Sequence, residues 1–130
     1  MTGFVTRVLP EACDVLAPDG SEVRILASSP RGSMAHFRLP PGQISKPVAH
    51  RSIEELWYVI SGQGEIWRKN ETAETVTALQ AGVSLSIPAN TQFQFRNTGT
   101  ATLDIVCVTM PPWPGEDEAY AVIGVWKPGG

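Results

Sequence analysis

The chain has 130 residues, of which 42% are hydrophobic and 18% charged, and its formal net charge at pH 7 is −3. This length fits one domain spanning residues 1–130, and the composition excludes a disordered chain. The ten lysine and arginine residues are scattered, so no nucleic-acid partner is expected. The apolar runs fall short of the ~20 residues that cross a bilayer, so no membrane partner is expected.

Two further features bear on the compartment. The first residues lack the basic region and apolar stretch of a signal peptide, which predicts a cytoplasmic protein. Cys13 and Cys107 lie far apart in the sequence, and in that compartment both are expected to be buried free thiols.

Short β-branched and aromatic runs, separated by glycine and proline, predict many strands and few helices. Asp19-Gly20 is the expected turn of a hairpin between residues 13–17 and 22–26. No long segment shows a helical period, so an all-β fold is predicted, an antiparallel sandwich or barrel of the jelly-roll kind. Further strands are expected at 33–39, 55–61, 64–69, 76–79, 83–87, 93–96 and 103–109.

The sequence changes character in the proline-rich tail, residues 110–130. The run from Met110 to Gly115 contains three prolines and cannot hold a strand ladder, because proline lacks the backbone donor. We expect this run to cross the barrel surface as an extended segment, with residues 116–118 solvated behind it. Residues 119–126 are expected to add a last strand or to pack on a partner subunit.

Two glycine-bounded stretches carry the most information about function. In the first, Gly42 precedes a strand that brings His50 inward, and Glu55 opens a second strand that Gly62 closes. The second stretch follows about twenty residues later and consists of Gly82, Pro88 and Asn97, with Asn90 between them. Asparagine tolerates a left-handed turn, so Asn90 is an acceptable substitute for glycine there.

These stretches resemble the two signature motifs of the cupin superfamily, in the order and at the short spacing of small bacterial single-domain cupins. The resemblance covers about residues 32–110 and implies a double-stranded β-helix, that is, a jelly-roll barrel. Cupins commonly bind a divalent transition metal through three histidines and the glutamate. Here Val48 stands at the first histidine position and Phe93 at the third, so only His50 and Glu55 remain of the four. The resemblance also implies a homodimer.

Two side chains rarely hold a first-row metal, so the candidate metal set, His50 and Glu55, needs a third member. His36 is the only other histidine. By strand alternation it shares a face with Arg38, while the apolar residues beside it favour the barrel interior. His36 is therefore expected outside the barrel or at a subunit interface; the alternative is an inward His36 that completes a site for zinc, nickel, iron or manganese.

Aromatic residues are predicted to form the walls of a small-molecule pocket around His50 and Glu55. Trp57 has the same phase as Glu55, and Phe93 and Phe95 share a face of their strand. Trp113 is expected to cover the mouth from the proline-rich tail. Simple core filling is the alternative for these side chains, above all for Phe95. Arg38 is a candidate for an anionic group of the ligand.

Two hypotheses about function follow. In the first, His50 and Glu55 are catalytic and carry isomerase-, epimerase- or lyase-like acid–base chemistry on a small organic molecule, with or without a weakly held divalent metal. In the second, the protein is a non-catalytic cupin that binds or senses a small molecule and has lost its metal site. The replacements Val48 and Phe93 support the second hypothesis, whereas the retained pair supports the first.

Overall fold

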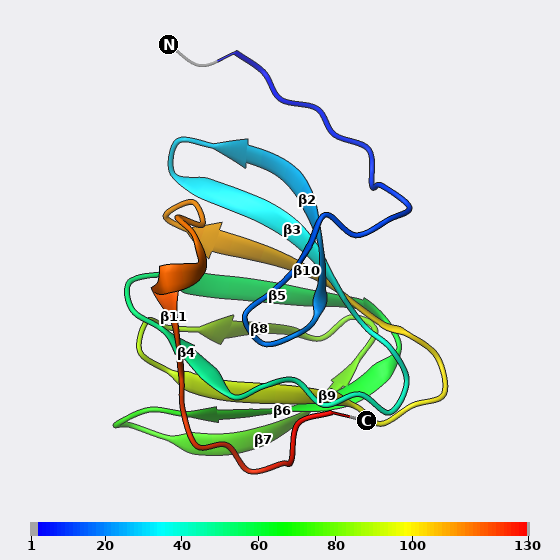
Figure 1. Cartoon of the computed structure of the whole chain (residues 1–130), viewed down its shortest axis with the longest axis vertical. Coiled ribbons are helices and arrows are strands. Elements are labelled where there is room, and N and C mark those ends of the chain that lie inside the picture. The colour runs from blue at the N-terminus through cyan, green and yellow to red at the C-terminus, as the bar shows by residue number, and fades with distance from the viewer. Residues whose placement is uncertain (1–2, 130) are drawn as a thin grey trace.

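Two antiparallel sheets face each other in the computed structural model, which describes residues 3–129 (Figure 1). The six-stranded sheet has the order β1-β2-β3-β10-β5-β8, and the five-stranded sheet has the order β11-β4-β9-β6-β7. In chain order the strands are β1 (Val15–Leu16), β2 (Glu22–Ser29), β3 (Gly32–Leu39), β4 (Val48–His50), β5 (Glu54–Ser61), β6 (Gln63–Lys69), β7 (Glu74–Gln80), β8 (Ser84–Ile87), β9 (Gln92–Asn97), β10 (Leu103–Met110) and β11 (Ala119–Ala121).

This architecture confirms the predicted all-β double-stranded β-helix. The apolar alternation of the strands produces it, because successive side chains of a strand point to opposite faces. On β5, Glu55, Trp57 and Val59 are buried while the residues between them are exposed. The inward side chains of both sheets form one hydrophobic core, whose fully buried members include Trp57, Phe93, Phe95, Ile66, Leu103 and Ile105.

The turns agree with the glycine pattern of the sequence. Asn90 has a φ of 61°, in the left-handed region that the second motif glycine would occupy. Gly64 shows a different need: a Cβ there would clash with the carbonyl oxygen of Arg96 on the neighbouring strand β9. The hairpin predicted around Asp19-Gly20 is confirmed, since β1 pairs with β2 in antiparallel register.

The tail is anchored more firmly than the sequence indicated. Glu118, expected to be solvated, is buried and accepts hydrogen bonds from the backbone N–H groups of Ser52 and Ile53 and from the Ser52 hydroxyl. A short 3-10 turn (Glu116–Glu118) leads into β11, which pairs with β4. The expectation for Glu118 was wrong, because its carboxylate satisfies the backbone donors of the loop before β5.

One cysteine also departs from expectation. Cys107 is buried on β10, as predicted, but Cys13 is exposed. It lies just before β1, in the segment that leads into the barrel. Within residues 3–129 we find no helix with the length and apolarity needed to traverse a bilayer.

Candidate functional site

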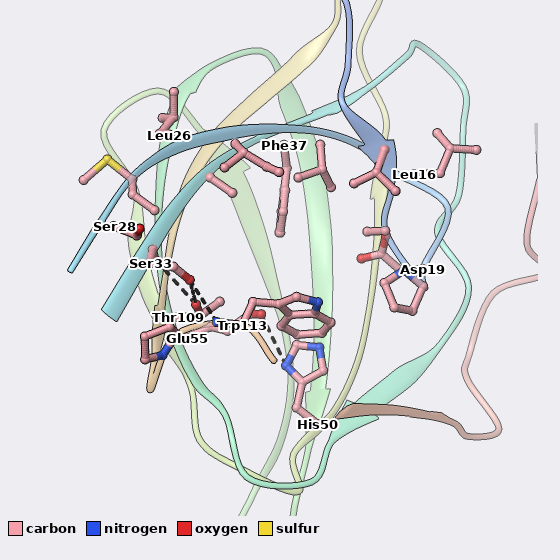
Figure 2. A pocket seen from close by; sticks show the side chains of 18 of the residues that line it. Leu16, Asp19, Leu26, Ser28, Ser33, Phe37, His50, Glu55, Thr109 and Trp113 are labelled. Carbon is pink, nitrogen blue, oxygen red and sulfur yellow. Dashed lines mark hydrogen bonds and ion pairs between the residues drawn. The ribbon is translucent and has the colours of Figure 1, made fainter. Parts of the chain in front are cut away.

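A cavity of about 350 Å³ lies at one end of the barrel (Figure 2). Most of its wall is apolar and comes from β1, β2, β3 and the turn between β1 and β2. Pro112 and Trp113 of the tail close another side. Among the described residues, six polar side chains line it, namely Asp19, Ser28, Ser33, His50, Glu55 and Thr109.

His50 and Glu55 approach each other from opposite sheets. His50 ends β4 of the five-stranded sheet, and Glu55 lies near the start of β5 of the six-stranded sheet. Their Nδ1 and Oε2 atoms are 3.3 Å apart, but the approach is not aligned as a hydrogen bond and leaves Nδ1 without a partner. The other oxygen of Glu55, Oε1, accepts a hydrogen bond of 2.7 Å from Trp57 Nε1.

Burial drives the two groups toward their neutral forms. It raises the pKa of Glu55 to about 7, against the opposing hydrogen bonds from Trp57 and Cys107. It lowers the pKa of His50 to about 4, against the opposing charge of Glu118. Between these two values His50 is an uncharged base and Glu55 an uncharged acid. The pair is therefore poised for proton transfer and is not an ion pair in that range.

Aromatic rings surround the pair at two depths. Phe93 and Trp113 line the cavity, and each packs edge-on against the His50 ring, with centroids 5.2 and 5.1 Å away. Trp57 and Phe95 lie behind this layer, are fully buried, and do not line the cavity. Trp57 acts on the site through Glu55, whereas Phe95 packs on Trp57 with ring centroids 5.0 Å apart.

Two candidate residues lie outside the cavity. His36 and Arg38 both contact Asp104 on the face of the six-stranded sheet that points away from it, at 3.0 and 2.9 Å. The apolar neighbours Ala35 and Phe37 take the inward face instead and line the cavity. Strand alternation enforces this division. The structure thus does not bring His36 to His50 and Glu55, and Arg38 cannot meet a ligand there.

The side chains present do not fit the metal site that the fold family implies. Val48 and Phe93, the two replaced positions, are direct cross-strand partners and present apolar surfaces to the cavity. One oxygen of Glu55 is already engaged by Trp57. Across the described part of the chain, no three histidine, cysteine, aspartate or glutamate side chains gather closely enough to hold a metal ion.

One residue of the site was missed by sequence reasoning. Asp19 was expected only as a turn residue, yet its side chain is 5% exposed and lines the cavity (Figure 2). Both of its hydrogen bonds, from the backbone N–H and the hydroxyl of Ser21, go to Oδ1. Ser21 two residues later is the sequence signal of such an Asx turn, but nothing local indicates that the turn folds over a cavity.

Removing the Trp113 ring should raise the pKa of His50 from about 4 toward its ordinary value. Burial is the main cause of the low value, and the Trp113 ring covers the imidazole. Imidazole nitrogen NMR across a pH series of Trp113→Ala measures the change. Trp126→Ala is the matched control, because that ring stacks on Arg96. An unchanged His50 titration in Trp113→Ala would contradict the expectation.

Residues 35–109, more than half of the chain, match the model of the cupin domain family. An uncharacterized protein of Methanocaldococcus jannaschii is 29% identical over 107 residues, covering 78% of this chain and 82% of that protein. A Klebsiella pneumoniae protein with a double-stranded β-helix domain superposes with a TM-score of 0.65 at 18% identity, covering 92% of this chain and 91% of the other. For Streptomyces PAC13 with uridine the TM-score is 0.70 at 19% identity, covering 94% and 92%.

The family match spans β3 to β10 and contains both motifs, together with His50 and Glu55. The segments that close the cavity, the first hairpin and the tail, lie outside the matched range. The chain belongs to the cupin family.

Proposed function

We propose that this cupin is an enzyme that moves protons on a small organic molecule, in an isomerase-, epimerase- or lyase-like reaction. The observation that carries the proposal is the contact between His50 and Glu55 at the floor of a mostly apolar cavity. Burial reverses the usual order of their pKa values, to about 4 for His50 and about 7 for Glu55. A neutral base can accept a proton from one position of a bound molecule, and a neutral acid beside it can donate a proton to another position.

One fold neighbour supports this class of chemistry. PAC13 is a nucleoside dehydratase, and its structure with uridine shares the fold of this chain at 19% identity. Dehydration is a lyase-type reaction that needs a base and an acid. The cavity of about 350 Å³ accommodates a ring-shaped molecule, and its aromatic walls favour one. The ligand preference follows from the lining of this cavity, because a shared fold at 19% identity does not carry a substrate with it.

The described side chains do not form the four-ligand metal site, so His50 and Glu55 themselves carry the proton transfers. His50 would accept the proton at a ring nitrogen, and Glu55 would donate from its carboxyl group. Trp57 holds the carboxyl group in place through the hydrogen bond to Oε1. Trp113 and Phe93 exclude water from the imidazole.

The test uses nitrobenzisoxazole, an uncharged ring that opens to a coloured phenolate when a base removes its carbon-bound proton. We expect a bell-shaped dependence of kcat/KM on pH, with limbs near the pKa values of about 4 and about 7. His50→Asn should lower the rate by about a hundredfold or more, and Glu55→Gln should remove the limb near neutral pH. Gln92→Asn, on the same sheet as His50, is the control and should leave the rate unchanged. A rate unaffected by His50→Asn would overturn the proposal.

The second candidate is a non-catalytic module that binds or senses a small molecule. The apolar pair Val48 and Phe93 favours it, because the two side chains turn former ligand positions into cavity wall. In that case the probe binds without turnover and both variants bind it equally well.

The expected homodimer and cytoplasmic location stay predictions. Sedimentation of the purified protein measures its oligomeric state.

A further inference from the structure

The described ionisable side chains that line the cavity include acids but no strong bases. Among its described lining residues there are two carboxyl groups, Asp19 and Glu55, and no lysine or arginine. A phosphate or carboxylate on a ligand would meet these acids without a compensating cation, which is unfavourable in an apolar surrounding. The lining thus disfavours anionic ligands.

Asp19 is the more exposed to a ligand of the two acids. Glu55 is committed to Trp57 through Oε1 and contacts His50 through Oε2. In Asp19 both hydrogen bonds from Ser21 go to Oδ1, so Oδ2 remains available. Figure 2 shows the Asp19 carboxyl group directed into the same space as His50 and Trp113.

A buried carboxylate without a cation is costly, and this cost has a chemical consequence. Burial raises the pKa of Asp19, and the nearby Asp19 in turn contributes to the raised pKa of Glu55. A positive group placed in the cavity would offset the desolvation of the Asp19 carboxylate. The rings of Phe37, Phe93 and Trp113 line the same cavity, and the π systems of such rings attract cations.

We propose that Asp19 is a specificity-determining residue that selects ligands carrying one ammonium group on a small apolar or ring-shaped body. The ammonium group donates to Asp19 Oδ2, and the body packs against the aromatic wall beside His50. This inference rests on the proposed function in one respect, that the cavity is the ligand site. It adds the charge of the ligand and a residue from the hairpin outside the family match, β1 to β2.

Three probes of matched shape test the proposal: phenylethylamine, phenylethanol and phenylpropionate, which are cationic, neutral and anionic at neutral pH. Binding to the full chain is measured by ligand- and protein-observed NMR. We expect the amine to bind at least about tenfold more tightly than the alcohol, and the acid to bind most weakly. In Asp19→Asn the advantage of the amine over the alcohol should fall to within about twofold, while the alcohol binds as before.

The variant is designed to fold. The asparagine carbonyl oxygen keeps the acceptor for Ser21, and the substitution removes a buried charge. Asp117→Asn makes the same change of net charge at an exposed position and should leave all three affinities unchanged. The comparison of probes on the unmodified chain needs no variant at all.

The outcomes separate this proposal from the one on which it rests. Binding of the alcohol without an advantage for the amine would overturn the role of Asp19 and leave the cavity as the ligand site. An amine advantage that survives in Asp19→Asn would overturn it as well. No binding of any probe would overturn both proposals. An amine preference that is lost in Asp19→Asn and kept in Asp117→Asn supports the inference.

Discussion

Glu55→Gln should make the protein more stable at about pH 8, by about 3 kcal/mol in the free energy of unfolding, and by less than about 1 kcal/mol at about pH 5. The carboxyl group is 2% exposed and has a pKa of about 7 in place of its ordinary 4.5. Above neutral pH the folded protein must therefore hold a buried negative charge. Glutamine has the same shape, carries no charge, and keeps an acceptor oxygen for Trp57 Nε1.

The sign follows from proton binding. Between pH 4.5 and about 7 the folded state holds the Glu55 proton that the unfolded state has already lost. Stability contributed by this group therefore falls as the pH rises through that interval. His50 acts in the opposite direction, because its folded pKa of about 4 lies below the ordinary 6.5, so its contribution falls as the pH drops from 6.5 to about 4. The pH-dependent contributions of Glu55 and His50 to stability largely cancel in the unmodified chain. Glu55→Gln removes the contribution of Glu55 and leaves that of His50.

Denaturant unfolding at several pH values, compared between the variant and the unmodified chain, measures the difference and removes the shared contribution of His50. Glu54→Gln is the matched control, because Glu54 is the neighbouring carboxylate on the exposed face of the same strand. It should change stability by less than about 0.5 kcal/mol at every pH. A Glu55→Gln variant that is less stable than the unmodified chain at about pH 8 would show that the charged form is stabilised in the folded protein.

Much of this site could be predicted from the sequence, because the spacing of the two motifs indicates which residues form the strands and turns of the barrel. Gly42, Glu55 and Gly62 indicate where β4 and β5 lie in the sequence. Strand alternation then predicts which side chains of these strands point into the barrel. The same alternation favoured an outward His36, and the structure places it beside Asp104. These inferences need only the period of a strand and the position of turns.

Other features depend on contacts between distant segments and had no local signal. Asp19 reads as an ordinary turn residue, and only the packing of the first hairpin over the barrel turns it toward Glu55. Glu118 reads as solvated, and only the pairing of β11 with β4 brings it to Ser52. Trp57 was expected to line the cavity, since it shares the phase of Glu55, but its ring is fully buried against Phe37 and Phe93, and those two rings line the cavity instead.

The double substitution Val48→His and Phe93→His should create a tight site for a divalent transition metal, with affinity raised by at least about a hundredfold over the unmodified chain. Both positions face the cavity, pair directly across β4 and β9, and lie on the same sheet as His50. Glu55 faces them from the opposite sheet. Three imidazoles and one carboxylate are a ligand set that suits zinc, nickel and iron.

Elemental analysis after desalting gives the metal content, and cobalt absorption reports the ligand geometry. We expect near-stoichiometric metal in the double variant, less in Phe93→His alone, and loss on desalting from the unmodified chain, since two side chains do not retain a first-row metal. His50→Ala in the double background should abolish retention. Far-UV circular dichroism checks the fold, because replacing the buried Phe93 costs about 1–3 kcal/mol.

Both possible results for the metal content bear on how this cupin works. A double variant that binds metal and loses proton-transfer activity toward nitrobenzisoxazole would show that the apolar pair, Val48 and Phe93, keeps His50 and Glu55 free for acid–base chemistry. Near-stoichiometric metal retained by the unmodified chain would contradict this account, because a ligand beyond His50 and Glu55 would then have to enter the cavity. The protein would in that case join the metal-dependent cupins despite the two apolar replacements.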